Sequence, residues 1–186
     1  MKRTRQAVAV VAAAVCALAG NASPALAAKS ELTKAQRSVL LEATREFRDV
    51  RRALAAGYLP TEDCVAGMGF HYVHPGRSAD GDIDPVLPEI LLYLPGRDGK
   101  LRLAGLEYFR ADADGDVRTR KDRPTLFGHG FDGPMTGHPM PPGAPPMPVH
   151  YDLHVWLYLP NPDGELAIEN PDVRCPEPHT RGHRTS

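Results

Sequence analysis

The segment from residue 149 to residue 159 alternates strictly, and this alternation constrains the fold more than any other stretch. Successive side chains of a β-strand point to opposite faces of a sheet. The apolar face comprises Tyr151, Leu153, Val155, Leu157 and Leu159. The other face comprises His150, Asp152, His154, Trp156 and Tyr158. A face that is both polar and aromatic is typical of a pocket wall, so the pattern predicts a strand with a core on one side and a candidate site on the other.

The amino-terminal residues have the composition of a secretory signal peptide. Three basic residues precede an apolar run at residues 7–18, and an Ala-Leu-Ala cleavage signal follows at residues 25–27. A membrane anchor would need roughly 20 apolar residues, and neither this run nor any later segment is long enough. We therefore predict a signal peptide at residues 1–27 and a secreted, extracellular protein with no integral membrane segment after cleavage.

The remaining chain is predicted to be one secreted domain, residues 28–176, followed by a disordered tail, residues 177–186. Cleavage leaves 19 basic and 23 acidic residues, a net charge of −4. A mildly acidic surface does not favour nucleic acid as a partner, and a metal ion or a small molecule remains the expected ligand.

Two cysteines remain after cleavage, Cys64 and Cys175. An even count in an exported protein predicts a disulfide. The alternative, a pair of thiolate metal ligands, is disfavoured because the two cysteines are far apart in the sequence and lie in an oxidising compartment.

Hydrophobic periodicity predicts an α+β fold. Apolar residues recur at helical spacing in an amino-terminal segment, and the rest of the chain has short strand patterns and a proline-rich, irregular segment. The predicted elements are a helix at residues 31–57, strands at 67–74, 89–94, 101–109, 149–159 and 164–168, and a loop at 124–148. We expect the amphipathic helix to pack on a mostly antiparallel sheet of about five strands. A small β-barrel or sandwich with one helix is the alternative.

Two further residues on predicted strands extend the candidate site. Strand parity places Glu107 on one face with Leu101, Leu103, Gly105 and Phe109, where burial of an acid is costly unless it is paired or bound to a metal. An exposed acid at a strand end, or a structural ion pair, is the alternative. His71 shares a face with Gly69 and Val73, a surrounding that leaves room for a ligand.

Histidines and carboxylates converging from neighbouring strands are typical of zinc, iron or copper sites. The predicted ligands are His71, Glu107, His150 and His154, and the predicted supporting residues are Asp152, Tyr108 and Trp156. One geometric objection applies, because residues four apart on an extended strand lie about 13 Å from each other. His150 and His154 would therefore bind one ion only if the strand is irregular. A polar pocket without metal is the alternative.

The proline-rich segment supports a second hypothesis, a copper-handling protein without turnover. Thioether and imidazole groups together select copper, and this segment contains His129, Met135, His138, Met140, Met147 and His150. Methionines that fill gaps beneath a loop are the simpler interpretation. A third hypothesis is a non-catalytic ligand-binding module with a pocket lined by Trp156, Tyr158 and Tyr72.

The sequence identifies no catalytic residue and leaves open whether the protein is an enzyme. It contains no Gly-x-Ser-x-Gly motif and no phosphate-binding glycine loop. A metal ion with an open coordination position would activate water or polarise a carbonyl, and Asp152 or Tyr108 would then be the proton carriers.

Several motifs, taken in order, resemble those of a family of secreted, functionally uncharacterised bacterial proteins, largely from actinomycetes. They are Cys64-Val65, Gly67 to Val73, Leu92 to Pro95, Gly105 to Phe109, Leu126 to Gly128, Phe131 to Met135, His150 to Trp156, Asn161-Pro162, Asn170-Pro171 and Cys175-Pro176. The resemblance covers roughly residues 45–176. It implies that His71, Glu107, His150 and His154 belong together, and it implies no particular activity.

Overall fold

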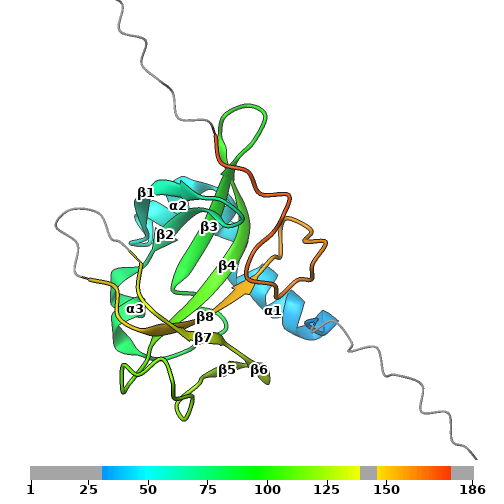
Figure 1. The fold of residues 1–186 in the computed structure, drawn as a ribbon. Coiled ribbons are helices and arrows are strands. Elements are labelled where there is room, and N and C mark those ends of the chain that lie inside the picture. The colour runs from blue at the N-terminus through cyan, green and yellow to red at the C-terminus, as the bar shows by residue number, and fades with distance from the viewer. Residues whose placement is uncertain (1–30, 139–145, 177–186) are drawn as a thin grey trace, which may run out of the picture.

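A computed structural model describes residues 31–138 and 146–176. Its main feature is an antiparallel sheet in the order β1-β2-β3-β4-β8-β7, which is not closed into a barrel (Figure 1). The strands in that order are Leu59–Val65, Gly69–Val73, Ile90–Pro95, Leu101–Ala111, His150–Val155 and Asp132–Met135. A separate two-stranded sheet pairs β5 (Thr125–Leu126) with β6 (His129–Gly130). The α+β prediction is confirmed, with six strands in the main sheet where about five were expected.

The predicted helix at residues 31–57 is divided into three pieces. They are α1 (Lys34–Thr44), the 3-10 helix η1 (Arg45–Arg48) and α2 (Val50–Ala55). Thr33 starts α1 with a capping box, in which its hydroxyl accepts from the Gln36 backbone N–H and the Gln36 side chain accepts from the Thr33 N–H. Asp49 causes the division, because its carboxylate accepts from the Arg51 N–H and begins a new helix there.

A short helix that the sequence patterns did not predict, α3 (Pro75–Asp80), follows β2. His74 caps it, because the His74 Nδ1 accepts from the Arg77 N–H, and Pro75 occupies the first turn, where a missing N–H costs nothing. It was missed because six residues are too few for a helical period to be visible.

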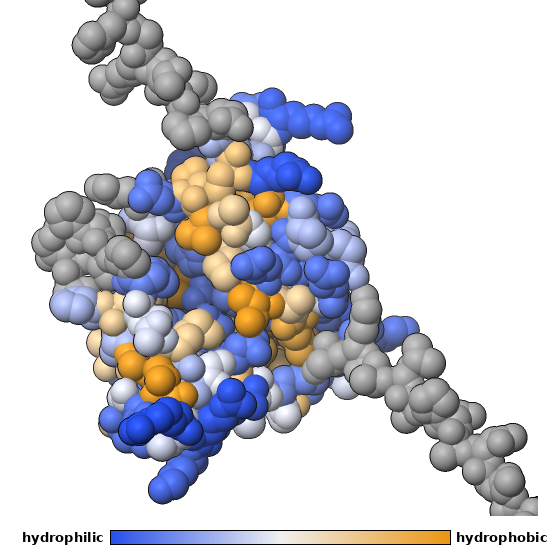
Figure 2. Space-filling view, viewed as in Figure 1, coloured by the Kyte–Doolittle hydropathy of each residue, from blue (hydrophilic) through white to orange (hydrophobic). Residues whose placement is uncertain are grey.

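The two faces of the sheet bury separate apolar cores. The core on the helix side contains Leu40, Phe47 and Ala53 from the helices, together with Tyr151, Leu153 and Val155 from β8. The core on the opposite side contains Ile90, Leu92, Ala104, Phe109, Trp156 and Val173. The predicted alternation of β8 is therefore confirmed from residue 151 to residue 156. On the surface face shown in Figure 2, apolar residues occur in small groups among hydrophilic ones.

Strand β4 departs from the predicted parity. The pairing of β3 with β4 shifts between Leu92 and Tyr93, which pair with Gly105 and Leu103, so Ala104 is an extra residue. Leu103 consequently lies in the helix-side core while Phe109 lies in the opposite one. Phe109 therefore shares the face of Glu107, as expected, but the expectation that Leu101 and Leu103 lie on that face was wrong.

One strand of the sheet was not predicted, and one predicted strand does not form. Strand β1 was missed because Pro60 and two acidic residues of the strand weaken the strand pattern at residues 59–65. Residues 164–168 form turns instead of a fifth strand, and they meet the end of β8 through a hydrogen bond from the Trp156 N–H to the Glu165 carbonyl, 2.8 Å.

The carboxy-terminal segment returns to the start of the sheet. A disulfide joins Cys64 in β1 to Cys175, as predicted. Hydrogen bonds from the Gly67 N–H to the Val173 carbonyl and from the Asn170 N–H to the Gly67 carbonyl fasten the same segment to the β1–β2 turn. Val173 thereby packs on the sheet face opposite the helices.

No helix in residues 31–138 and 146–176 is both long enough and apolar enough to cross a membrane. The predicted signal peptide at residues 1–27 and the predicted tail at residues 177–186 lie outside the described residues, as does Met140.

Candidate metal centre

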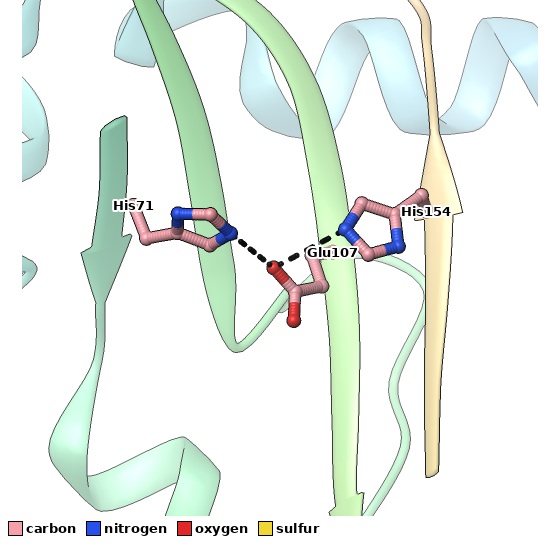
Figure 3. A group of neighbouring side chains, drawn as sticks. All are labelled: His71, Glu107 and His154. Carbon is pink, nitrogen blue, oxygen red and sulfur yellow. Dashed lines mark ion pairs between the residues drawn. The ribbon is translucent and has the colours of Figure 1, made fainter. Parts of the chain in front are cut away.

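Three strands each contribute one side chain to a compact group on the sheet face opposite the helices. His71 comes from β2, Glu107 from β4 and His154 from β8 (Figure 3). Glu107 and His154 are direct cross-strand partners. His71 approaches from the far side of β3, which separates β2 from β4. The backbone pairing of the sheet therefore brings the group together.

Both imidazoles direct Nε2 to the same carboxylate oxygen. The Glu107 Oε2 lies 3.2 Å from the His71 Nε2 and 3.6 Å from the His154 Nε2. One ligand atom from each residue lies within 4.8 Å of the other two. Ligand atoms about 2.1 Å from a tetrahedral ion are about 3.4 Å apart, close to these contacts. The group could therefore hold a metal ion with small side-chain movements.

Glu107 and His154 are buried, His71 is partly buried, and several polar atoms of the group are poorly satisfied. His154 is 1% exposed and Glu107 5% exposed. Among the described residues, the Glu107 Oε2 and both ring nitrogens of His154 have no partner with hydrogen-bond geometry. Buried polar atoms without partners cost about 1–3 kcal/mol each, so such a cluster needs an explanation. A metal ion bound between the two residues would satisfy the Glu107 Oε2 and the His154 Nε2.

The pKa shifts of Glu107 and His154 favour the protonation states in which both side chains can bind a metal ion. Burial alone would raise the pKa of Glu107, but the neighbouring His154 and His71 outweigh it and hold that pKa down to about 2. Burial lowers the pKa of His154, which disfavours its charged form. An ionised carboxylate beside a neutral imidazole is the combination that a divalent ion requires.

His150 lies outside this group. It pairs with Ala111 on β4, whereas His154 pairs with Glu107, four residues away along the same strand. The His150 Nδ1 lies 3.0 Å from the Pro148 carbonyl oxygen, and its Nε2 lies 4.0 Å from an Asp152 oxygen. The spacing objection raised from the sequence therefore applies, because the strand between the two histidines is regular.

Asp152 lies between the two histidines of β8. Its Oδ1 is 3.8 Å from the His154 Nδ1, and the residue is 5% exposed. Burial raises the pKa of Asp152 to about 8, with further contributions from Glu107 and Asp132. Asp132, which pairs with Asp152 across β7 and β8, was not identified from the sequence because the proline-rich segment around it hides the strand.

The aromatic residues divide between the two faces. Trp156 lies on the site side, where its ring stacks on that of His154 at 6.4 Å and its indole N–H donates to the Ala167 carbonyl. Tyr108 points to the other face and donates its hydroxyl to the Pro85 carbonyl. Tyr72 and Tyr158 also pack with the helix-side core. The structure thus gathers neither Tyr108 with Glu107 nor Tyr72 and Tyr158 with Trp156.

Part of the methionine–histidine set gathers at the β7–β8 edge. Met135 pairs with His150, and the ring centroids of His138 and His150 are 6.5 Å apart. Met147 packs against the core that contains Phe109. His129 lies in the separate two-stranded sheet.

Comparisons with protein-family models, with curated proteins and with solved structures find no match in any of the three. The resemblance seen in the sequence motifs therefore stays a prediction.

Proposed function

We propose that this chain is an exported metal-binding protein in which His71, Glu107 and His154 hold one divalent transition-metal ion. The observation that carries the proposal is the meeting of three potential ligand atoms, of which the Glu107 Oε2 and the His154 Nε2 are buried without a hydrogen-bond partner in the described chain. The alternative interpretation, a structural ion pair, does not account for the unpartnered nitrogens of His154.

The donor set supports zinc or ferrous iron. Two imidazoles and one carboxylate form the protein ligands of many catalytic zinc sites and of non-haem iron sites. Copper(I) prefers sulfur ligands, and none of the three residues supplies sulfur. Three protein ligands leave at least one coordination position for water or a substrate, where the ion would act as a Lewis acid.

Metal analysis of protein purified without a histidine tag tests the proposal. We expect about one equivalent of zinc or iron, retained through dialysis and lost in Glu107→Gln and His154→Ala. His74→Asn is the matched control, because it removes a histidine outside the group and keeps a side chain able to cap α3. Metal content that is absent from the wild type, or that survives both ligand substitutions, would show that the proposal is wrong.

Export is the second part of the proposal. It is supported by the signal-peptide pattern of residues 1–27 and by the Cys64–Cys175 disulfide, since disulfides persist in oxidising compartments. Protein recovered outside the cells should begin at residue 28 on amino-terminal sequencing. Protein that stays inside the cells with residues 1–27 intact contradicts this part.

A further inference from the structure

A buried row of side chains leads from the metal group to a backbone carbonyl. Starting at His154, the row continues through Asp152 to His150 and ends at the Pro148 carbonyl oxygen. Its contacts are 3.8 Å, 4.0 Å and 3.0 Å long. His154, Asp152 and His150 are each at least nine-tenths buried. Figure 3 shows the second ring nitrogen of His154 on the side away from Glu107, where the row begins.

The Pro148 carbonyl determines which ring nitrogen of His150 carries the proton. A carbonyl oxygen only accepts, so the His150 Nδ1 at 3.0 Å must carry a proton and donate it. In the neutral imidazole the Nε2 is then the lone-pair atom. The Nε2 lies 4.0 Å from the Asp152 Oδ2.

The same matching extends to His154. The Asp152 Oδ1 and the His154 Nδ1 face each other, and neither has a hydrogen-bond partner in the described part of the chain. The Asp152 Oδ1 is an acceptor, so the His154 Nδ1 is the donor of this pair. The His154 Nε2 is left with its lone pair, directed at the position between Glu107 and His71.

We infer that Asp152 is a positioning residue that fixes the tautomer of His154 and presents the Nε2 lone pair to the metal. This inference rests on the proposed function. Partners of this kind, which orient a ligating histidine through its other nitrogen, typically change metal affinity by about 10- to 100-fold.

A buried donor and a buried acceptor that face each other and lack other partners among the described residues are best satisfied by each other. Closing the row to hydrogen-bond lengths requires the Asp152 and His154 side chains to approach their partners by about 1 Å.

The tautomer can be read in the metal-free protein by ¹H–¹⁵N correlation NMR of the histidine side chains. We expect a proton on Nδ1 of both His154 and His150. A proton on the His154 Nε2 in the wild type overturns the inference. Because this measurement needs no metal, it decides the inference even if the wild type binds no zinc, which would refute only the proposed function.

Asparagine and leucine at position 152 provide the second measurement. Asparagine has nearly the shape of aspartate and keeps a carbonyl oxygen that can accept from His154. Leucine has a similar volume and no acceptor. We expect Asp152→Leu to weaken zinc binding by about 10- to 100-fold and to mix the tautomers of His154. Asp152→Asn should keep the Nδ1–H tautomer and bind zinc more tightly than Asp152→Leu. Equal losses in the two variants overturn the inference.

Discussion

Glu89 offers a prediction about stability that can be worked out from the structure. This residue precedes β3, is 1% exposed, and accepts a hydrogen bond from the Phe109 N–H, 3.2 Å. Burial raises its pKa from 4.5 to about 8. The folded protein therefore keeps a proton that the unfolded chain releases above about pH 4.5, so ionisation opposes folding.

The size of the effect follows from this pKa difference. One pKa unit corresponds to about 1.4 kcal/mol, so the whole shift is worth at most about 5 kcal/mol. The contribution is most favourable below about pH 4.5 and is lost progressively as the pH rises to about 8. Between pH 5 and pH 7 the free energy of unfolding should fall by about 2–3 kcal/mol on account of Glu89 alone.

The assay compares the wild type with Glu89→Gln by urea denaturation at several pH values from 5 to 8. Glutamine keeps an oxygen that accepts from Phe109 but has no charge to bury. The variant should therefore gain about 2–3 kcal/mol relative to the wild type between pH 5 and pH 7. Taking the difference removes the parallel contribution of Asp152, whose pKa burial also raises to about 8.

Glu42→Gln is the control for this experiment, because Glu42 is 72% exposed and its removal leaves the core unchanged. A difference between wild type and Glu89→Gln that does not vary with pH would refute the reasoning. It would mean that Glu89 is hydrated or paired enough to ionise in the folded protein.

Three further predictions concern stability and the metal. Replacing Cys64 and Cys175, 111 positions apart, with alanine should lower the free energy of unfolding by up to about 4–5 kcal/mol in urea denaturation, and an unchanged midpoint would contradict this. Leu40→Ala, at a fully buried position, should lower the free energy of unfolding by about 2–5 kcal/mol. Val39→Ala, at a 44% exposed position, should change it by less than about 0.5 kcal/mol. Cobalt(II) bound at the proposed site should quench the fluorescence of Trp156, the chain's one tryptophan, which stacks on a proposed ligand, with an endpoint at one equivalent. Fluorescence that cobalt leaves unchanged would place the ion elsewhere.

The alternation of apolar residues predicted the faces of a strand where the strand is regular. Strict alternation assigned the faces of β8 correctly because Tyr151, Leu153 and Val155 all pack in one core. The same reasoning failed on β4, where the extra residue Ala104 transfers Leu103 to the other face. A bulge arises from pairing with a neighbouring strand and leaves no mark in the period of its own strand.

The helix prediction failed for a related reason. Helical spacing places Leu54 on one apolar stripe with Leu40 and Phe47, yet Leu54 is 45% exposed and its neighbour Ala53 is buried. Spacing predicts one continuous stripe, but Asp49 restarts the helix and turns the later stripe to a new direction. The sequence shows that Asp49 is a residue type that caps helices, but it does not show that the helix changes direction there.

The composition of the metal group illustrates the same limit most clearly. Alternation placed His150 and His154 on one face of the same strand, but a regular strand holds them too far apart to share an ion. The structure instead takes one residue from each of three strands, and Glu107 meets His154 because the β4–β8 register pairs them. Register depends on contacts between segments far apart in the chain. The sequence therefore predicts which residue types are candidate ligands, and the strand pairing determines which of those residues meet. A slip of one residue between β4 and β8 would turn His154 to the helix-side core and abolish the group. The hydrogen bonds of the sheet therefore hold the three side chains of the proposed site in place, and an ion bound there would have only to draw them together.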